Sequence, residues 1–261
     1  MKKANLDFLS MLGLAVLAGA FISLGAIFST VALTTTEPLQ VPWGWMRIVA
    51  GLVFSLGLIL VIVGGGELFT GNNLIIMAWA SRRISSLKLL RNWGIEYLGN
   101  LIGAVATAVV VFFSKHYLMA NGNLGVTALN IANGKVHLDF VQALVLGLLC
   151  NALVCLAVWL TYSARSTLGR IASIIFPITA FVAAGFEHCV ANMYFIPFAI
   201  LIRIGAVDKF WQATDINSAD YSDLNWISFL YHNLLPVTIG NIIGGVIFVA
   251  GVYWVIYLRK K

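Results

Sequence analysis

The stretch Glu67-Leu68-Phe69-Thr70-Gly71-Asn72 decides the fold, because it places a carboxyl group and an amide in the middle of a long apolar segment. The same spacing, a glutamate followed five residues later by an asparagine, returns at Glu187 and Asn192. A carboxyl group at bilayer depth is tolerated where it finds a partner or lines a cavity. The two copies therefore predict breaks in two membrane-spanning helices, at about 64–72 and 183–192.

A second duplicated element follows each break, Gly99-Asn100 in the first half and Gly240-Asn241 in the second. The two glutamates are 120 residues apart, whereas the two asparagines are 141 residues apart. The difference of 21 residues matches a polar stretch at about 205–225, which has no counterpart in the first half and is expected outside the cell, over the pore mouth. We predict one transmembrane domain over 1–261, built from two repeats at about 8–114 and 140–258.

The composition indicates a polytopic membrane protein. Hydrophobic residues make up 61% of the chain and charged residues 10%, and the mean hydropathy is +0.94, whereas a soluble domain carries about 25% charged residues. Six apolar segments are long enough to span a bilayer: about 8–33, 46–80, 93–114, 140–163, 171–202 and 229–258. The first is too long for the apolar part of a signal peptide and is predicted to be retained. Three spans in each half turn the second copy upside down, so the expected fold is all-α, an inverted 3+3 repeat with broken second and fifth spans.

The basic residues predict the orientation. Eleven of the sixteen fall on one side of a six-span arrangement: Lys2, Lys3, Arg82, Arg83, Lys88, Arg91, Arg165, Arg170, Arg259, Lys260 and Lys261. The positive-inside rule places that side, and both termini, in the cytoplasm of a cell bounded by this membrane. Topology accounts for the net charge of +6, so no nucleic-acid partner is expected.

The polar groups at the breaks are expected to have two roles: some fix the loops, and others line a polar passage. Glu67 and Glu187 are interpreted mainly as groups that fix the loops by accepting hydrogen bonds, with direct proton transfer as the alternative. Asn100 and Asn241 are expected to pair with backbone groups freed by the breaks. Thr70 adds a hydroxyl to the first break, and the amides of the two elements, Asn72 and Asn192, are candidates for the polar passage.

His188 is the strongest candidate for a residue that transfers a proton to the anion. It lies inside the second break, and the inverted repeat is expected to bring it opposite Thr70. Imidazole is the side chain whose charge changes near neutral pH. A protonated His188 would attract a small anion and hand it a proton, and the neutral acid would cross an apolar constriction at lower cost than the anion.

Other residues near the breaks have both a functional and an ordinary interpretation. Lys135, placed in the outer loop before the fourth span, is either a solvated charge or a group that concentrates anions. Apolar side chains around the breaks are either constrictions or core: Phe54, Leu58, Leu68, Phe69 and Phe181. The three cysteines fall inside spans without metal-ligand spacing, so we expect no metal, cofactor or disulfide.

The chain resembles the formate/nitrite transporter family, and more closely its formate-channel branch, over almost its whole length. The resemblance rests on 67–72, on 151–159, on 185–193 and on 236–245. It implies an aquaporin-like fold, a homopentamer in the lipid bilayer with one pore per subunit, and passage of small monovalent anions, here formate. By this resemblance Thr70 and His188 lie on the two broken-helix loops, Lys135 and Asn151 match polar positions near the pore, and Phe54, Phe181 and Leu58 match constrictions.

Three alternatives were weighed against a formate channel. Members associated with nitrite have a lysine shortly before the Cys-Asn of the fourth span, whereas this chain has Leu146-Gly147-Leu148-Leu149 there, so nitrite or hydrosulfide is the second choice. A water or glycerol channel would carry Asn-Pro-Ala at the breaks, and neither break contains proline. A membrane-embedded enzyme using Glu187 and His188 lacks an activated nucleophile.

Overall fold

The computed structural model describes residues 3–36 and 41–259, and over that part of the chain the regular elements are all helices. The first half contains α1 (Phe8–Leu33), α2 (Trp43–Gly64), the short α3 (Phe69–Asn72) and α4 (Ile76–Ala80), and α5 (Ser86–Phe113). The second half contains α6 (Asn123–Val136), α7 (Phe140–Thr161), α8 (Thr167–Ala184), α9 (Cys189–Gly205), α10 (Asp208–Thr214) and α11 (Leu235–Ile243). Helix α11 is the middle of a helical stretch from Ser228 to Leu258, which has π-type turns on either side.

Both predicted breaks are present, and glycine ends the helix at each. Helix α2 stops at Gly65 with φ 94°, and α8 stops at Gly185 with φ 78°. This left-handed conformation is strained for other residues and is a common end for a helix. Three residues later the chain is extended, at Leu68 and at His188, and helix restarts as α3 and α9. The fold with broken second and fifth spans is therefore confirmed.

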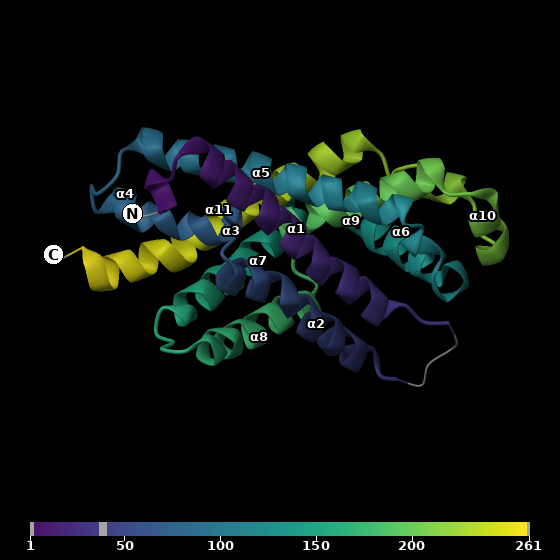
Figure 1. The fold of residues 1–261 in the computed structure, drawn as a ribbon, viewed down its shortest axis with the longest axis horizontal. Helices are drawn as coiled ribbons and strands as arrows, with labels where there is room; N and C mark the ends of the chain where they lie inside the picture. Colours follow the sequence, from purple (N-terminus) through teal and green to yellow (C-terminus); the bar gives the residue numbers. More distant parts are fainter. Residues whose placement is uncertain (1–2, 37–40, 260–261) are drawn as a thin grey trace.

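The spans pack closely at glycines. Helix α1 lies against α2 and α5, as α7 lies against α8 and α11, and α2 contacts α8 across the two halves (Figure 1). A Cβ atom at Gly103 would overlap the carbonyl group of Val16, and one at Gly240 would overlap that of Leu144. These glycines allow the helix backbones to approach each other closely.

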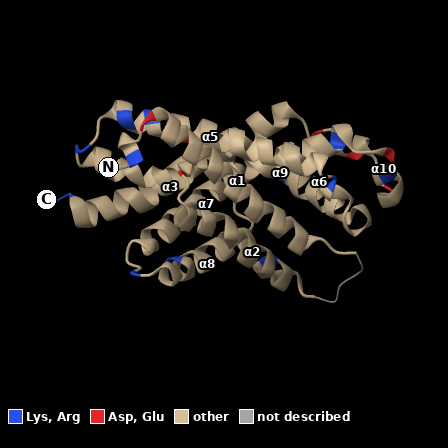
Figure 2. Ribbon diagram, in the orientation of Figure 1, with Lys and Arg blue, Asp and Glu red and all other residues tan. Residues whose placement is uncertain are grey.

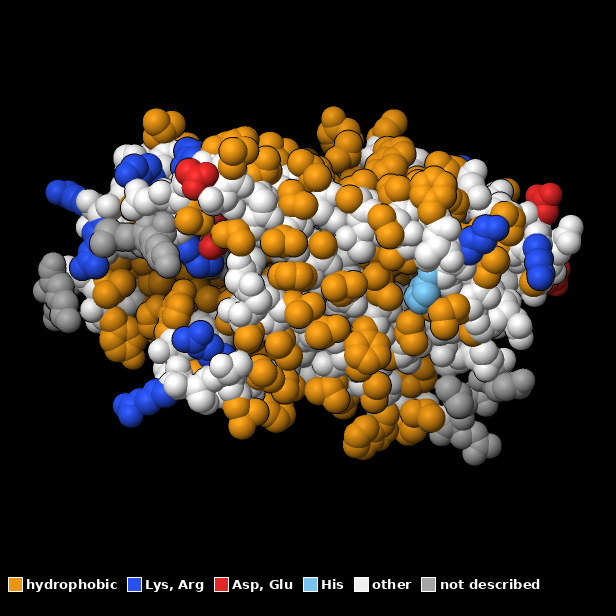
Figure 3. Space-filling view, in the orientation of Figure 1, with side chains coloured by type: hydrophobic (Ala, Val, Ile, Leu, Met, Phe, Trp, Pro, Cys, Tyr) orange, Lys and Arg blue, Asp and Glu red, His pale blue; other side chains and the backbone are white. Residues whose placement is uncertain are grey.

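The surface fits a protein embedded in lipid. Six helices in the described residues are long and apolar enough to cross a membrane. Charged residues gather at the two ends of the molecule, and the middle is largely free of them (Figure 2). The space-filling view shows hydrophobic side chains over most of this middle region (Figure 3). Both termini lie at the same end, which we call the termini side (Figure 1). Three residues named in the sequence interpretation lie outside the described ranges: Lys2, Lys260 and Lys261.

Two segments at the end opposite the termini differ from the sequence interpretation. Lys135 lies in the last turn of helix α6 and not in a loop. The helix was missed because it is too polar to read as a span, although its buried residues recur every three or four positions from Leu124 to Val136. The polar stretch 205–225 contains α10 and is anchored by Phe210, whose ring packs edge-on against Tyr117 at 5.5 Å.

Candidate functional site

His188 and Thr70 join the two breaks at the centre of the molecule. The Nε2 atom of His188 lies 3.0 Å from the Thr70 hydroxyl oxygen, and both residues are buried. The Nδ1 atom accepts a hydrogen bond of 3.1 Å from the backbone N–H of Ala191, so that His188 caps α9. Because Nδ1 accepts, the proton of a neutral ring lies on Nε2 and points at Thr70. The predicted pairing of Thr70 with His188 is confirmed.

Each break is held by an asparagine from a neighbouring span. The Asn100 oxygen accepts the backbone N–H of Phe69 at 2.9 Å, and its amide nitrogen donates to the carbonyl groups of Ala15 at 2.7 Å and Glu67 at 3.0 Å. Asn241 makes the equivalent three bonds in the second half, to Cys189, Gly147 and Glu187. The two asparagines thus satisfy backbone groups that the broken helices leave unpaired, as expected.

The two glutamates also occupy matching places. Oε2 of Glu187 accepts from Asn192 at 2.7 Å and from Asn233 at 3.1 Å, and Oε1 is 2.7 Å from the Lys135 ammonium group. In the first half, Oε2 of Glu67 accepts from Asn72 and lies 3.0 Å from the ammonium group of Lys3. Each carboxylate therefore anchors the helix that follows its break and has a lysine as counter-ion.

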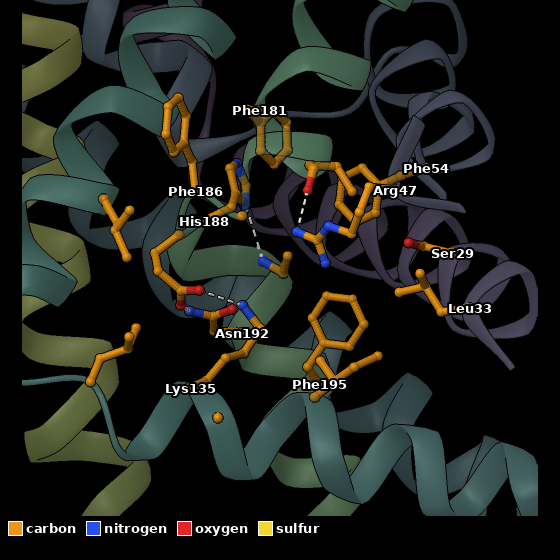
Figure 4. A pocket seen from close by; sticks show the side chains of 18 residues that line it. Ser29, Leu33, Arg47, Phe54, Lys135, Phe181, Phe186, His188, Asn192 and Phe195 are labelled. Atoms are coloured by element: carbon orange, nitrogen blue, oxygen red, sulfur yellow. Dashed lines mark hydrogen bonds and ion pairs between the residues drawn. The ribbon is translucent and has the colours of Figure 1, made fainter. Parts of the chain in front are cut away.

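A cavity of about 230 Å³, which we call the His188 cavity, opens beside the second break. Arg47 and Lys135 reach it from different sides, and His188 lies next to Phe181 (Figure 4). Arg47 donates to the carbonyl oxygens of Val182 and Ala183 at the end of α8, at 2.7 and 3.2 Å. The charged lining is therefore two cations and the single carboxylate of Glu187, which leaves one positive charge in excess. Such a cavity favours a small anion.

Two aromatic rings lie beside His188. Phe54 and Phe181 meet edge-on at 5.6 Å between ring centres, and the Phe181 ring stacks on His188 at 5.9 Å. Both phenylalanines line the His188 cavity. Leu58 and Leu68 are buried and line neither this cavity nor those on the termini side. Phe69 packs edge-on against Trp93 and Tyr97 of α5, so its ring is part of the helix packing in this structure.

The termini side holds two adjoining cavities of about 860 and 350 Å³ that share Lys3 and Tyr162, and we call them together the Lys3 cavity. Gly71 and Asn72 line the larger one, and Glu67 lines the smaller one. Thr70 lines neither these cavities nor the His188 cavity. The hydrogen-bonded Thr70–His188 pair thus separates the two sides.

Asn151 is completely buried and lines neither the His188 cavity nor the Lys3 cavity. Its amide donates to the Asn73 side chain at 3.0 Å and to the backbone carbonyl of Asn241 at 2.7 Å. It therefore ties the first break to the last span. Four further polar residues at the breaks were not singled out from the sequence: Arg47, Asn73, Asn233 and Glu96. The fixed separation of 141 residues could have found Asn233 as the partner of Asn92.

Comparisons with known proteins agree with this geometry. The family model described as formate/nitrite transporter matches residues 1–255. The formate channel FocA of Escherichia coli (strain K12) is 45% identical over 259 residues, which cover 99% of this chain and 90% of the relative. The structure of a pentameric formate channel with formate bound superposes with a TM-score of 0.91 and 45% identity, and covers 97% of this chain and 98% of that one.

A more distant likeness bears on the fold alone. The aquaglyceroporin from Plasmodium falciparum superposes with a TM-score of 0.50 and 14% identity, over 97% of this chain and 98% of that one. The expected aquaporin-like architecture is therefore confirmed. The relatives are channels and transporters of a multi-pass membrane family. The alternative of a membrane-embedded enzyme is therefore rejected.

Proposed function

The chain belongs to the formate/nitrite transporter family, and from this premise we propose that it is a formate channel in which the anion passes through the His188 cavity, past the Thr70–His188 pair and out through the Lys3 cavity. The observation that carries the proposal is the contact of 3.0 Å between His188 Nε2 and Thr70 Oγ1, which joins the two breaks between cavities that open toward opposite ends. The relatives named as formate channels support formate as the anion.

The His188 cavity attracts the anion. The Lys135 ammonium group cancels the charge of Glu187, which remains free to hold Asn192, and Arg47 supplies the positive charge in excess. An anion near Arg47 then has to leave water to pass Phe54 and Phe181. Moving a bare carboxylate through such an apolar gap costs several kcal/mol, about the effective cost of burying an ion. Protonation of the anion removes most of this cost.

His188 takes up a proton only when an anion is near. A positive ring would lose the hydrogen bond from Ala191 to Nδ1 and would carry its charge at the amino terminus of α9, where cations are disfavoured. An anion beside Nε2 offsets both effects. The ring then gives its Nε2 proton to the formate, which leaves as the neutral acid, and the remaining proton of the neutral ring is on Nδ1. The Ala191 bond re-forms once that proton is released from Nδ1 and another proton is taken up at Nε2. In this scheme His188 and Thr70 act directly on the anion, whereas Asn72, Asn151 and Asn192 keep the loops in place.

A flux assay in liposomes tests the proposal. Purified protein is reconstituted, and the initial rates for formate, acetate, nitrite and hydrosulfide are compared from pH 5 to pH 8. We expect formate to be fastest, with a rate that rises toward low pH, because the proton delivered by His188 becomes easier to replace. Nitrite or hydrosulfide as the fastest ion would identify one of the alternatives within the family, and the absence of flux of any of them would reject an anion channel.

We also propose that the protein lies in the inner membrane with both termini in the cytoplasm, as a homopentamer. The basic residues of the termini side support the orientation through the positive-inside rule, and the pentameric relative supports the subunit number. Alkaline phosphatase fused after Arg259 should be inactive if the orientation is right. Native mass spectrometry in mild detergent should show five chains, and a stable monomer or trimer would contradict the assembly.

A further inference from the structure

One buried carboxyl group has no counterpart in the other half of the chain. Between α5 and the last span, residues 141 positions apart match: Asn92 with Asn233, Gly99 with Gly240, and Asn100 with Asn241. The same spacing pairs Glu96 with Val237, and both side chains are completely buried. A glutamate thus stands on the termini side where the opposite side has an apolar residue.

Glu96 shares a hydrogen-bonding group with Glu67. Its Oε1 atom accepts from the amide nitrogens of Asn92, at 2.6 Å, and of Asn72. The same Asn72 nitrogen donates to Oε2 of Glu67 at 2.5 Å, so a single amide lies between two carboxyl groups. The Oε2 atom of Glu96 is buried and has no hydrogen-bond partner among the described residues. An ionised carboxylate with an orphaned oxygen is costly in the protein interior.

The charges around the pair do not balance. Lys3 lies 3.0 Å from Glu67 and is the cation in direct contact with the pair. Arg170 of α8 lines the cavity beside Glu67, and Arg82, Arg83 and Arg259 line the cavity beside Asn72, but among the described residues none of these four arginines forms an ion pair with Glu67 or Glu96. Tyr162, which follows α7, is uncharged, and α1 presents the thioether of Met11. On the opposite side Lys135 faces Glu187 alone. Two ionised carboxyl groups against one ammonium group would leave a buried negative charge, and two carboxyl groups that share a site tend to keep one proton between them.

We propose that Glu67 and Glu96, bridged by the amide of Asn72, form a proton-holding pair that exchanges its proton with the Lys3 cavity, so that anion movement from the termini side responds to the pH on that side. The inference rests on the proposed formate passage. Asn72 and Lys3 line the cavity and connect the pair to water. With one proton bound, the pair and Lys3 together are neutral. Without it they carry one negative charge beside the route of the anion.

The direction of the effect follows from that charge. Raising the pH on the termini side removes the proton, and the negative charge then repels formate that approaches Asn72. We expect the rate from this side to fall by roughly tenfold, the effect of a unit charge about 10 Å away at an effective dielectric constant near 20. Glu96→Gln keeps the shape and the hydrogen bond from Asn72 but cannot ionise. Glu96→Val copies the residue that the chain itself places at 237.

The test compares these variants with the unaltered protein in liposomes of one orientation. The pH on the termini side is varied while the other side is held constant. The rate in protein-free liposomes is subtracted at each pH to remove diffusion of free formic acid, and each corrected rate is divided by that of Glu96→Gln, which cancels the effect of His188. We expect this ratio to fall as the pH rises, and the two variants to share one profile. A ratio that stays constant with pH overturns the proposal.

Infrared difference spectroscopy gives a readout that does not depend on transport. The C=O stretch of a protonated, buried carboxyl group should be present in the unaltered protein at low pH and absent in Glu96→Gln. No such band would overturn the proposal. If the band is present and lost in the variant while no formate passes at any pH, the proposed function fails and the proton-holding pair remains.

Discussion

The ion pair of Lys135 and Glu187 contributes to the stability of the fold and to the charge of the His188 cavity. Single and double variants of the pair change these two contributions differently, so their effects on stability and on transport can be measured separately. The ammonium group is 2.7 Å from the carboxylate, and the side chains are 15% and 5% exposed. Removing one partner of a buried pair costs about 3–5 kcal/mol of stability. Glu187 keeps its bonds from Asn192 and Asn233, so we expect Lys135→Met to cost the lower value, about 3 kcal/mol.

The same change removes the excess positive charge of the His188 cavity, because Arg47 and Glu187 then cancel. For an anion about 8 Å from the lost charge, at an effective dielectric constant near 20, this amounts to about 2 kcal/mol, or roughly a 30-fold slower uptake. The double variant Lys135→Met with Glu187→Gln restores the excess charge and keeps an amide able to accept from Asn192. It should recover most of the stability and most of the flux.

The assay measures initial formate uptake in liposomes at one fixed pH, together with the thermal unfolding of the same proteins in detergent. Lys135→Arg serves as the control, since it keeps the charge. Recovery of both quantities in the double variant supports the charge balance. A double variant that is stable but as slow as Lys135→Met would refute it, because the ammonium group would then have to contact the anion itself.

The remaining predictions concern the centre of the passage and the end opposite the termini. His188→Asn retains a good helix cap and should preserve the fold but flatten the rise of formate flux toward low pH; an unchanged pH profile in liposomes would exclude proton delivery by this ring. Thr70→Val removes the hydroxyl that contacts His188 at nearly constant volume, and should lower formate flux or selectivity with little loss of oligomer stability; unchanged flux would end the assignment. The exposed His137 donates to the Asn133 carbonyl at 2.7 Å and to Asp223 at 3.1 Å, and these bonds raise its pKa above 6.5, with the Asn133 bond as the largest cause. A raised pKa stabilises the folded state below the unfolded pKa, and the effect is lost as the pH rises through the folded value. The protection of amides around Asp223, taken as the exchange rate relative to the intrinsic rate at the same pH, should therefore be higher at pH 6 than at pH 8, and His137→Gln should remove this difference in protection.

The sequence was sufficient for those parts of the fold that are repeated. The two Glu–Asn elements located the breaks, and the two Gly–Asn elements located the asparagines that hold them, because duplication makes a weak signal visible twice. The pairing of Thr70 with His188 followed from the same logic. Helix α6 was not predicted, because it is too polar to read as a span and because it packs mainly on α9, far away in the sequence. A hydrogen bond of 2.8 Å from the Tyr221 hydroxyl to Asn130 also ties it to the 205–225 segment. Lys135 was therefore placed in a loop, although its distance to Glu187 depends on that helix.

The parts that could not be predicted are those in which the two halves differ. Arg47 looked like an ordinary residue near a membrane boundary, and only the fold shows that it lies over the end of α8. Glu96 lies on a span that otherwise reads as apolar, and a search for repeated motifs passes over it because its counterpart is Val237.

These differences make the two ends of the proposed passage unlike in charge. Symmetric halves would present the same charged contacts at both ends. In this chain the single carboxylate beside His188 contacts one lysine, whereas two carboxyl groups at Asn72 contact one lysine, in a cavity that four arginines also line. An anion is attracted at the first end and meets a titratable charge at the second. The duplicated framework holds the two broken loops in place, and in the proposed passage the unmatched residues Arg47 and Glu96 set the charge that an anion meets at each end.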